Sequence, residues 1–130
     1  MNKKLCIAGS IFGLTAVILG AFAAHGLKDL IDYSAVDSFQ TGVRYQMYHA
    51  LFLLVIGTTS LIPKKTKNLL FFGIMVGTVL FSGSIYALAT NPLTNFDFKT
   101  FGIVTPIGGS ILVISWLILL ISVIKTREDN

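Results

Sequence analysis

Two histidines and a few serines lie in or beside apolar runs, and these are the residues whose types could support chemistry. Imidazole can act as a general base or ligate haem and metal ions, so His25 and His49 could do either. A serine beside such a base could act as a nucleophile, which makes Ser82 or Ser84 with His49 a conceivable pair. The chain carries no nucleophile motif and no third metal ligand near the histidines. We therefore expect no catalytic residue, no metal site and no cofactor.

The elements that position these side chains are predicted to be membrane-spanning helices. Hydrophobic residues make up 54% of the 130 residues and charged residues only 12%, whereas a soluble domain carries about 25% charged residues. A chain this short cannot bury so much apolar surface in one soluble core. Composition therefore excludes a soluble globular protein, and it excludes a disordered one as well.

Four apolar stretches are about long enough to cross a bilayer, which takes roughly 20 helical residues. The sequence predicts an all-α, polytopic membrane protein with a single domain, 1–130, and spans at about 5–24, 43–62, 69–89 and 101–124. The first span resembles a secretory signal that ends in Ala21-Phe22-Ala23. Its removal would leave three spans with the new N-terminus outside, so we expect it to be retained.

The basic residues predict the orientation of the chain. Seven of the ten lie on one side of the predicted membrane: Lys3, Lys4, Lys64, Lys65, Lys67, Lys125 and Arg127. The positive-inside rule therefore places both termini and the connection around Lys64 in the cytoplasm. This excess of basic residues on the cytoplasmic side accounts for the net charge of +4. We therefore expect no nucleic-acid partner.

Small residues recur at helical spacing in three of the four spans, and several of them are glycines. The glycines are Gly9, Gly13 and Gly20 in the first span, Gly73 and Gly77 in the third, and Gly108 in the fourth. Small faces let membrane helices approach closely and gain dispersion contacts. We expect these glycines to pack the four helices into one bundle, and one such face could also form a homo-oligomer.

The second span is the least apolar. Residues 50–62 offer only about 20 Å of helical rise, so the span must also include residues 42–49. This puts His49 in the outer half of the bilayer and Arg44 near its outer boundary. We expect the helix to begin near Ser34 or Ala35, outside the membrane. The same depth argument brings polar groups of all four helices to one layer.

The candidate polar site consists of His25, Arg44, Tyr45, Gln46, His49, Ser82, Ser84, Tyr86 and Thr105. Polar groups inside a membrane are costly and should bond to one another. Two interpretations stay open. The site is either a hydrogen-bonded layer that fixes the register of the helices, or a binding site for a lipid head group, a small solute or a proton. In the second case Arg44 could hold a phosphate.

Four blocks of the sequence resemble the YgdD/YwdK-like small bacterial membrane proteins, a domain of unknown function (number 423) related to an animal transmembrane protein. Residues 20–27 read GAFAAHGL, similar to the family's GAFGAHGL, with Ala23 in place of a glycine. Residues 41–51 resemble its TGxxYQxxHxL block, 80–86 its LFSGSxY block and 105–109 its TPxGG block. The resemblance implies a four-helix protein of the bacterial plasma membrane and supplies no activity, substrate or cofactor. It implies that the signature residues are His25, Gly42, Tyr45, Gln46, His49, Ser82, Ser84, Tyr86, Thr105 and Pro106.

From these patterns we expect a small, non-enzymatic, multi-pass protein of the bacterial plasma membrane. Its partners would be the lipid bilayer and either a second copy or another membrane protein. A binding site or conduit for a small solute, ion or lipid head group is the alternative function. An intramembrane enzyme or a haem protein is a third.

Overall fold

All regular structure in the computed structural model is helical within residues 1–95, 97 and 99–127, which are the residues that the structure describes. This confirms the all-α prediction. The four long helices are α1 (Lys3–His25), α2 (Tyr33–Thr58), α3 (Lys64–Ala89) and α4 (Val104–Lys125). Three short 3-10 helices lie between them: η1 (Leu27–Asp29), η2 (Asn91–Leu93) and η3 (Lys99–Ile103).

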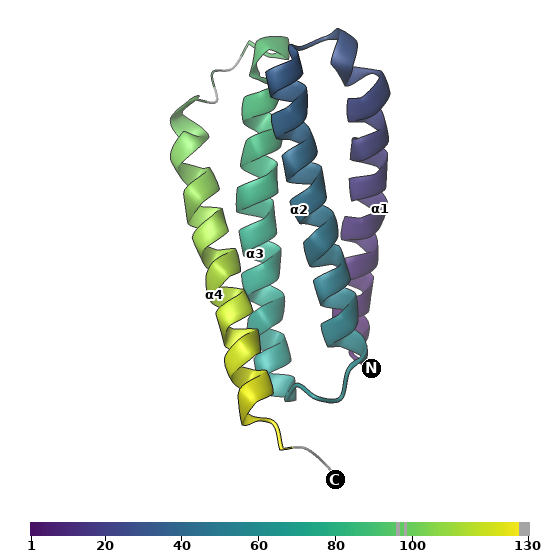
Figure 1. The fold of residues 1–130 in the computed structure, drawn as a ribbon, viewed down its shortest axis with the longest axis vertical. Coiled ribbons are helices and arrows are strands. Elements are labelled where there is room, and N and C mark those ends of the chain that lie inside the picture. Colours follow the sequence, from purple (N-terminus) through teal and green to yellow (C-terminus); the bar gives the residue numbers. More distant parts are fainter. Residues whose placement is uncertain (96, 98, 128–130) are drawn as a thin grey trace.

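The helices run up and down in chain order, and the N-terminus and the end of α4 lie at the same end of the molecule (Figure 1). α1 packs on α2, α2 on α3, and α3 on α4. Within the described residues α4 has no extensive packing with α1. The expected bundle is therefore an open row. In lipid this arrangement is stable because the surrounding chains are as apolar as another helix would be.

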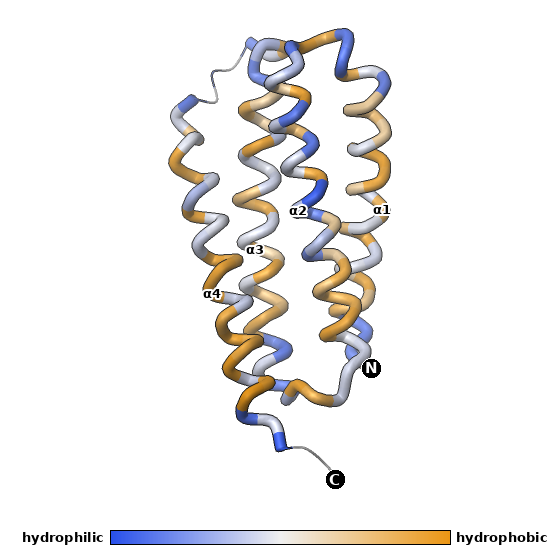
Figure 2. Tube along the Cα trace, in the orientation of Figure 1, coloured by the Kyte–Doolittle hydropathy of each residue, from blue (hydrophilic) through white to orange (hydrophobic). Residues whose placement is uncertain are grey.

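Three of the helical segments are long and apolar enough to cross a membrane: Lys3–Asp29, Lys64–Ala89 and Lys99–Lys125. Helix α2 lacks such a window because its first half carries the polar residues of the second span. Figure 2 shows this mixed character beside the more apolar α4. With 26 residues, α2 still rises about 39 Å, enough to span a bilayer. A fourth transmembrane span stays a prediction.

The helix ends differ from the expected ones by a few residues. Helix α2 begins at Tyr33, because the Asp32 side chain caps it by accepting a hydrogen bond from the Ala35 N–H at 2.8 Å. It ends at Thr58, four residues before the predicted end of the span. The lysines that were expected in a connection belong to the first turn of α3, which starts at Lys64.

Two apolar clusters hold the row together, one toward each end. The larger, near the termini, contains Leu5, Ala8, Phe52, Leu53, Ile56, Ile62, Leu70, Ile74 and Leu112. The smaller, at the opposite end, contains Ala23, Leu27, Phe39 and Ala89. Along α2 and α3 the buried polar residues other than Lys67 fall between these clusters. The fold thus places a polar layer between two apolar ones.

Glycines of α1 lie along the seam with α2. A Cβ atom at Gly9 would come within 2.8 Å of the Ala50 carbonyl oxygen, and one at Gly20 within 3.2 Å of Val43. At Gly13 the approach is looser, since a Cβ would lie 3.8 Å from the Ala50 side chain. The absence of side chains at Gly9 and Gly20 therefore lets the two backbones meet.

The seam between α3 and α4 is tighter. A Cβ at Gly77 would come within 2.7 Å of the Leu112 side chain, and one at Gly73 would collide with the Ser115 hydroxyl. At Gly108 it would collide with the backbone of α3 itself. Because a backbone in a helix cannot move aside like a side chain, Gly108 marks the position where this seam is least tolerant.

Candidate functional site

Gln46 is the centre of the polar contacts. Its side-chain nitrogen donates hydrogen bonds to the Phe12 carbonyl at 2.9 Å and to the Thr15 hydroxyl at 2.7 Å, both on α1. Its side-chain oxygen accepts a hydrogen bond from the Tyr86 hydroxyl of α3 at 2.7 Å. The residue is only 7% exposed. One buried amide therefore joins α1, α2 and α3 with both of its donors and its acceptor engaged.

Two serines of α3 extend these contacts to both of its neighbours. Ser82 donates to the Gly42 carbonyl of α2 at 2.8 Å. Ser84 shares a hydrogen bond with Thr105 of α4 at 2.5 Å, and its hydroxyl also lies 3.0 Å from the Phe81 carbonyl. Gly42 is itself a close-approach position, because a Cβ there would meet the Tyr86 ring at 2.7 Å.

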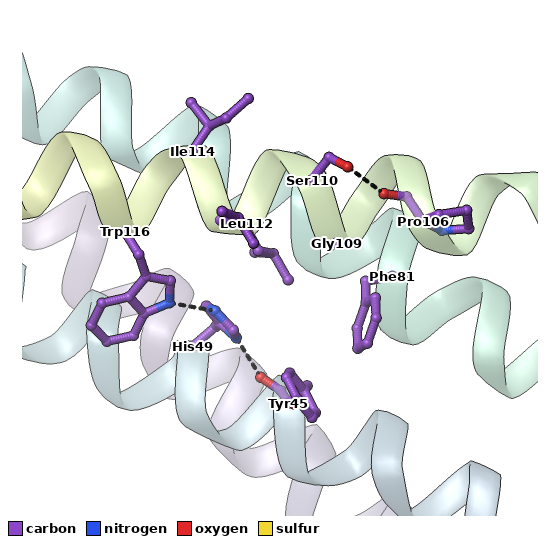
Figure 3. A pocket seen from close by; sticks show the side chains of 10 residues that line it. Tyr45, His49, Phe81, Pro106, Gly109, Ser110, Leu112, Ile114 and Trp116 are labelled. Atoms are coloured by element: carbon purple, nitrogen blue, oxygen red, sulfur yellow. Dashed lines mark hydrogen bonds between the residues drawn. The ribbon is translucent and has the colours of Figure 1, made fainter.

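His49 is buried, with 3% of its surface exposed, and both ring nitrogens have partners. Nδ1 lies 2.6 Å from the Tyr45 carbonyl oxygen, and Nε2 lies 3.1 Å from the indole Nε1 of Trp116 on α4. A carbonyl only accepts and an indole N–H only donates. The pairing therefore assigns the neutral ring with its hydrogen on Nδ1 and its lone pair on Nε2. Figure 3 shows both contacts.

The structure brings together six of the nine candidate residues in what we call the hydrogen-bonded layer: Gln46, His49, Ser82, Ser84, Tyr86 and Thr105. The other three contribute no side-chain hydrogen bond to it. His25 is exposed at the end of α1. Arg44 is exposed and donates to the Thr41 hydroxyl of its own helix at 2.9 Å. Tyr45 contributes its carbonyl to His49, while its ring packs 5.0 Å from that of Phe81.

Trp116 was missed by the sequence analysis. It is the chain's one tryptophan and lies in the middle of the most apolar run, where no spacing rule links it to a histidine 67 positions earlier. A useful signal was its polar N–H at mid-membrane depth, since a buried indole N–H usually finds a hydrogen-bond partner.

The serines and His49 are not arranged as a nucleophile and its base. The Ser82 and Ser84 hydroxyls bond to carbonyls and to Thr105, and the free lone pair of His49 accepts from Trp116. Within the described residues no serine hydroxyl bonds to the imidazole. The same part of the chain holds no group of three His, Cys, Asp or Glu side chains that could bind a metal ion.

A groove of about 580 Å³ lies between α2 and α4, over α3, beside His49 (Figure 3). We call it the α2/α4 groove. Its lining is mostly aromatic and aliphatic: Tyr45, His49, Phe81, Pro106, Gly109, Ser110, Leu112, Val113, Ile114 and Trp116. Its existence follows from the open row, because α4 packs on α3 and leaves its side toward α2 uncovered.

Comparison with known proteins places the chain in a family. The model of the protein family of unknown function DUF423 matches residues 19–109. The chain belongs to this family. The match contains all nine candidate polar residues, whereas Gly9, Gly13 and the basic N-terminal residues precede it.

Bacterial relatives in the family match over nearly their whole length. A UPF0382 membrane protein of Staphylococcus epidermidis is 42% identical over 127 residues, which is 95% of this chain and 97% of the relative. The UPF0382 membrane protein YwdK of Bacillus subtilis is 38% identical, over 95% of this chain and 98% of YwdK. One of Haemophilus influenzae is 34% identical, over 98% and 99%. No solved structure matches. The family resemblance read from the sequence is confirmed, and the chain is a bacterial membrane protein of an uncharacterised family.

Proposed function

We propose that this DUF423 protein is a non-enzymatic, multi-pass protein of the bacterial plasma membrane that acts through contacts its helices make within the bilayer. In this proposal the hydrogen-bonded layer lies in the outer leaflet and fixes the register of the helices. The observation that carries it is Gln46, whose two donors and one acceptor are all used within the protein.

A conduit or a solute site would need polar atoms that face an open path. The polar atoms of the layer instead bond to one another or to other groups of the protein, and Ser82 is only 1% exposed. An unsatisfied polar group in hydrocarbon costs several kcal/mol, so mutual satisfaction favours a dry layer. Placement in the outer leaflet is supported by charge, because the basic residues gather at the opposite end of the row.

The accessibility of the layer to water tests this proposal. In a Cys6→Ser background, Ser82→Cys in a lipid nanodisc should resist a membrane-impermeant maleimide that reaches both surfaces. Asn95→Cys, at an exposed position between α3 and α4, should react fully and serves as the control. Rapid labelling of Ser82→Cys would show a water-filled path and would replace the structural role with that of a conduit.

The α2/α4 groove favours a second candidate function, the binding of a lipid-soluble ring compound that bears a hydroxyl group. The groove is lined by aromatic rings, and its polar element is the pair of His49 and Trp116. Trp116 is 47% exposed, so its ring has room to turn away and leave Nε2 of His49 to accept a hydrogen bond from the ligand hydroxyl.

Because Trp116 is the sole tryptophan, its fluorescence reports on this groove directly. If the groove binds such compounds, 4-bromophenol should quench the fluorescence saturably, and His49→Phe should abolish the saturable part. Bromobenzene, which lacks the hydroxyl, should quench both proteins to the same extent in proportion to its concentration. Identical, unsaturated quenching of both proteins by 4-bromophenol would reject this second function.

A further inference from the structure

A basic pocket of about 580 Å³ lies at the end of the molecule that carries the N-terminus, between the first turns of α1 and α3. Four lysines line it: Lys3, Lys4, Lys64 and Lys67. The four acidic residues that the structure describes, Asp29, Asp32, Asp37 and Asp97, belong to the opposite end of the row. The pocket is therefore strongly positive, with no carboxylate partner in the described part of the chain.

The helices that form the pocket add to this potential. Both α1 and α3 begin here, so the positive ends of two helix dipoles lie at the pocket. Asn2 caps α1 by accepting from the Leu5 N–H. Helix α3 has Pro63 at its cap position and no capping side-chain bond. Its first N–H groups thus lack a side-chain acceptor, which is the arrangement that favours an anion.

Lys67 is the most buried of the four lysines that line the pocket. The residue is only 8% exposed, and its ammonium group donates one hydrogen bond, to the Thr59 carbonyl at 2.6 Å. An ammonium group carries three donors. A buried charge is costly unless it is paired, and Lys67 borders the pocket. A phosphate oxygen in the pocket would supply the counter-charge.

An apolar groove adjoins the basic pocket. A groove of about 460 Å³ runs between α1 and α3, and it shares Lys3 and Lys4 with the basic pocket. Its other walls include Ile7, Ile11, Phe71 and Met75. Lys4 lies at the junction, with its ammonium 4.3 Å from the centre of the Phe71 ring. We call this the α1/α3 groove.

We propose that these two cavities together bind one anionic phospholipid, with its phosphate in the basic pocket and an acyl chain in the α1/α3 groove. A positive pocket that shares two lysines with an apolar groove along the helices matches an amphiphile whose head lies at the membrane surface. The site contains neither Arg44 nor any residue of the hydrogen-bonded layer, so it goes beyond the proposed function.

Native mass spectrometry of the full chain in detergent tests this site. Phosphatidylglycerol should be retained as a single adduct, and phosphatidylcholine should not. Lys64→Gln should weaken retention of phosphatidylglycerol about fivefold, the effect of one lysine near an anionic surface. Lys65→Gln is the matched control. Lys65 is the exposed neighbour of Lys64 and does not border the pocket, so this substitution removes the same charge from outside the pocket.

Two further arms distinguish the source of the phosphate. Inorganic phosphate and glycerol 3-phosphate carry the head-group chemistry without acyl chains, and neither should compete at millimolar concentration. Competition by either would assign the pocket to a free phosphate and overturn the lipid. Equal loss of phosphatidylglycerol retention in Lys64→Gln and Lys65→Gln would indicate general attraction to surface charge and would overturn binding in the pocket. Equal retention of phosphatidylglycerol and phosphatidylcholine by the parent protein would overturn it as well.

Discussion

Replacing Gly108 with alanine should lower the free energy of unfolding by about 3 kcal/mol, at the upper end of the usual cost of overpacking. The new Cβ would collide with the Phe81 backbone nitrogen and lie 2.8 Å from the Leu80 carbonyl carbon. Both atoms belong to the backbone of α3, which cannot turn to another rotamer. Helix α4 would have to move outward and would lose its close packing along the seam.

Gly109→Ala is the matched control for this prediction. A Cβ at Gly109 would lie 3.5 Å from the Phe81 ring, an ordinary contact, and alanine is the better helix former by up to about 1 kcal/mol. The control should be neutral or slightly stabilising. Unfolding by sodium dodecyl sulfate in mixed micelles, followed by Trp116 fluorescence, measures both variants. Equal stability of Gly108→Ala and Gly109→Ala would mean that α4 does not approach α3 as closely as described.

The sequence predicted most of the helices because membrane spans depend on length and apolarity, both of which can be read directly from the chain. The 3-10 turns and exact ends depended on local capping instead. Asp32 caps α2, which begins at Tyr33, whereas the sequence predicted a start near Ser34 or Ala35. A capping side chain competes with its neighbours for the same N–H groups, so spacing alone leaves the start uncertain by a residue or two.

The open row could not be predicted from apolar patterns. In water, the apolar stripe of a helix shows which side is covered, because the other side must be polar. In lipid both sides can be apolar, as in α4, where Val113 and Ile124 are exposed although the helix is firmly packed on α3. The number of helices that pack on α4 therefore could not be predicted from its sequence, and neither could the α2/α4 groove.

The sequence predicted the membrane depth of most candidate site residues, but only partly which neighbour each side chain faces. Counting residues from the span ends gives the depth of a side chain in the membrane, and it placed Gln46, Ser82 and Thr105 near one level. The same count placed His25 there, yet Gln46 meets α1 at Phe12 and Thr15. His25 ends that helix ten residues after Thr15, which is about 15 Å of helical rise beyond this level. Depth fixes one coordinate, while the rotation of each helix about its axis depends on packing. The pairing of His49 with Trp116 depends on that rotation as well.

Replacing Gln46 with leucine should lower the free energy of unfolding by about 2–3 kcal/mol, because it removes three hydrogen bonds and leaves buried partners unsatisfied. The Thr15 hydroxyl retains its bond to the Ile11 carbonyl. The main cost therefore falls on the Tyr86 hydroxyl, which loses Gln46 as its acceptor. Gln40→Leu is the matched control on the same helix. Its side chain makes one long contact of 3.5 Å to the Gly20 carbonyl and should have little effect on stability.

A double-mutant cycle with Tyr86→Phe separates the hydrogen bond from the change in packing. Tyr86→Phe alone should cost about 1 kcal/mol. In that background Gln46→Leu should cost about 1 kcal/mol less than in the parent protein, because no hydroxyl is left without an acceptor. A coupling near zero would mean that the Tyr86 hydroxyl finds another acceptor once Gln46 is gone. The Ser82 hydroxyl beside Tyr86 is the protein group that could accept instead, and water is the other candidate. A coupling that stays near zero in a Ser82→Ala background would leave water as the acceptor, would contradict a dry layer and would favour a conduit along the same residues.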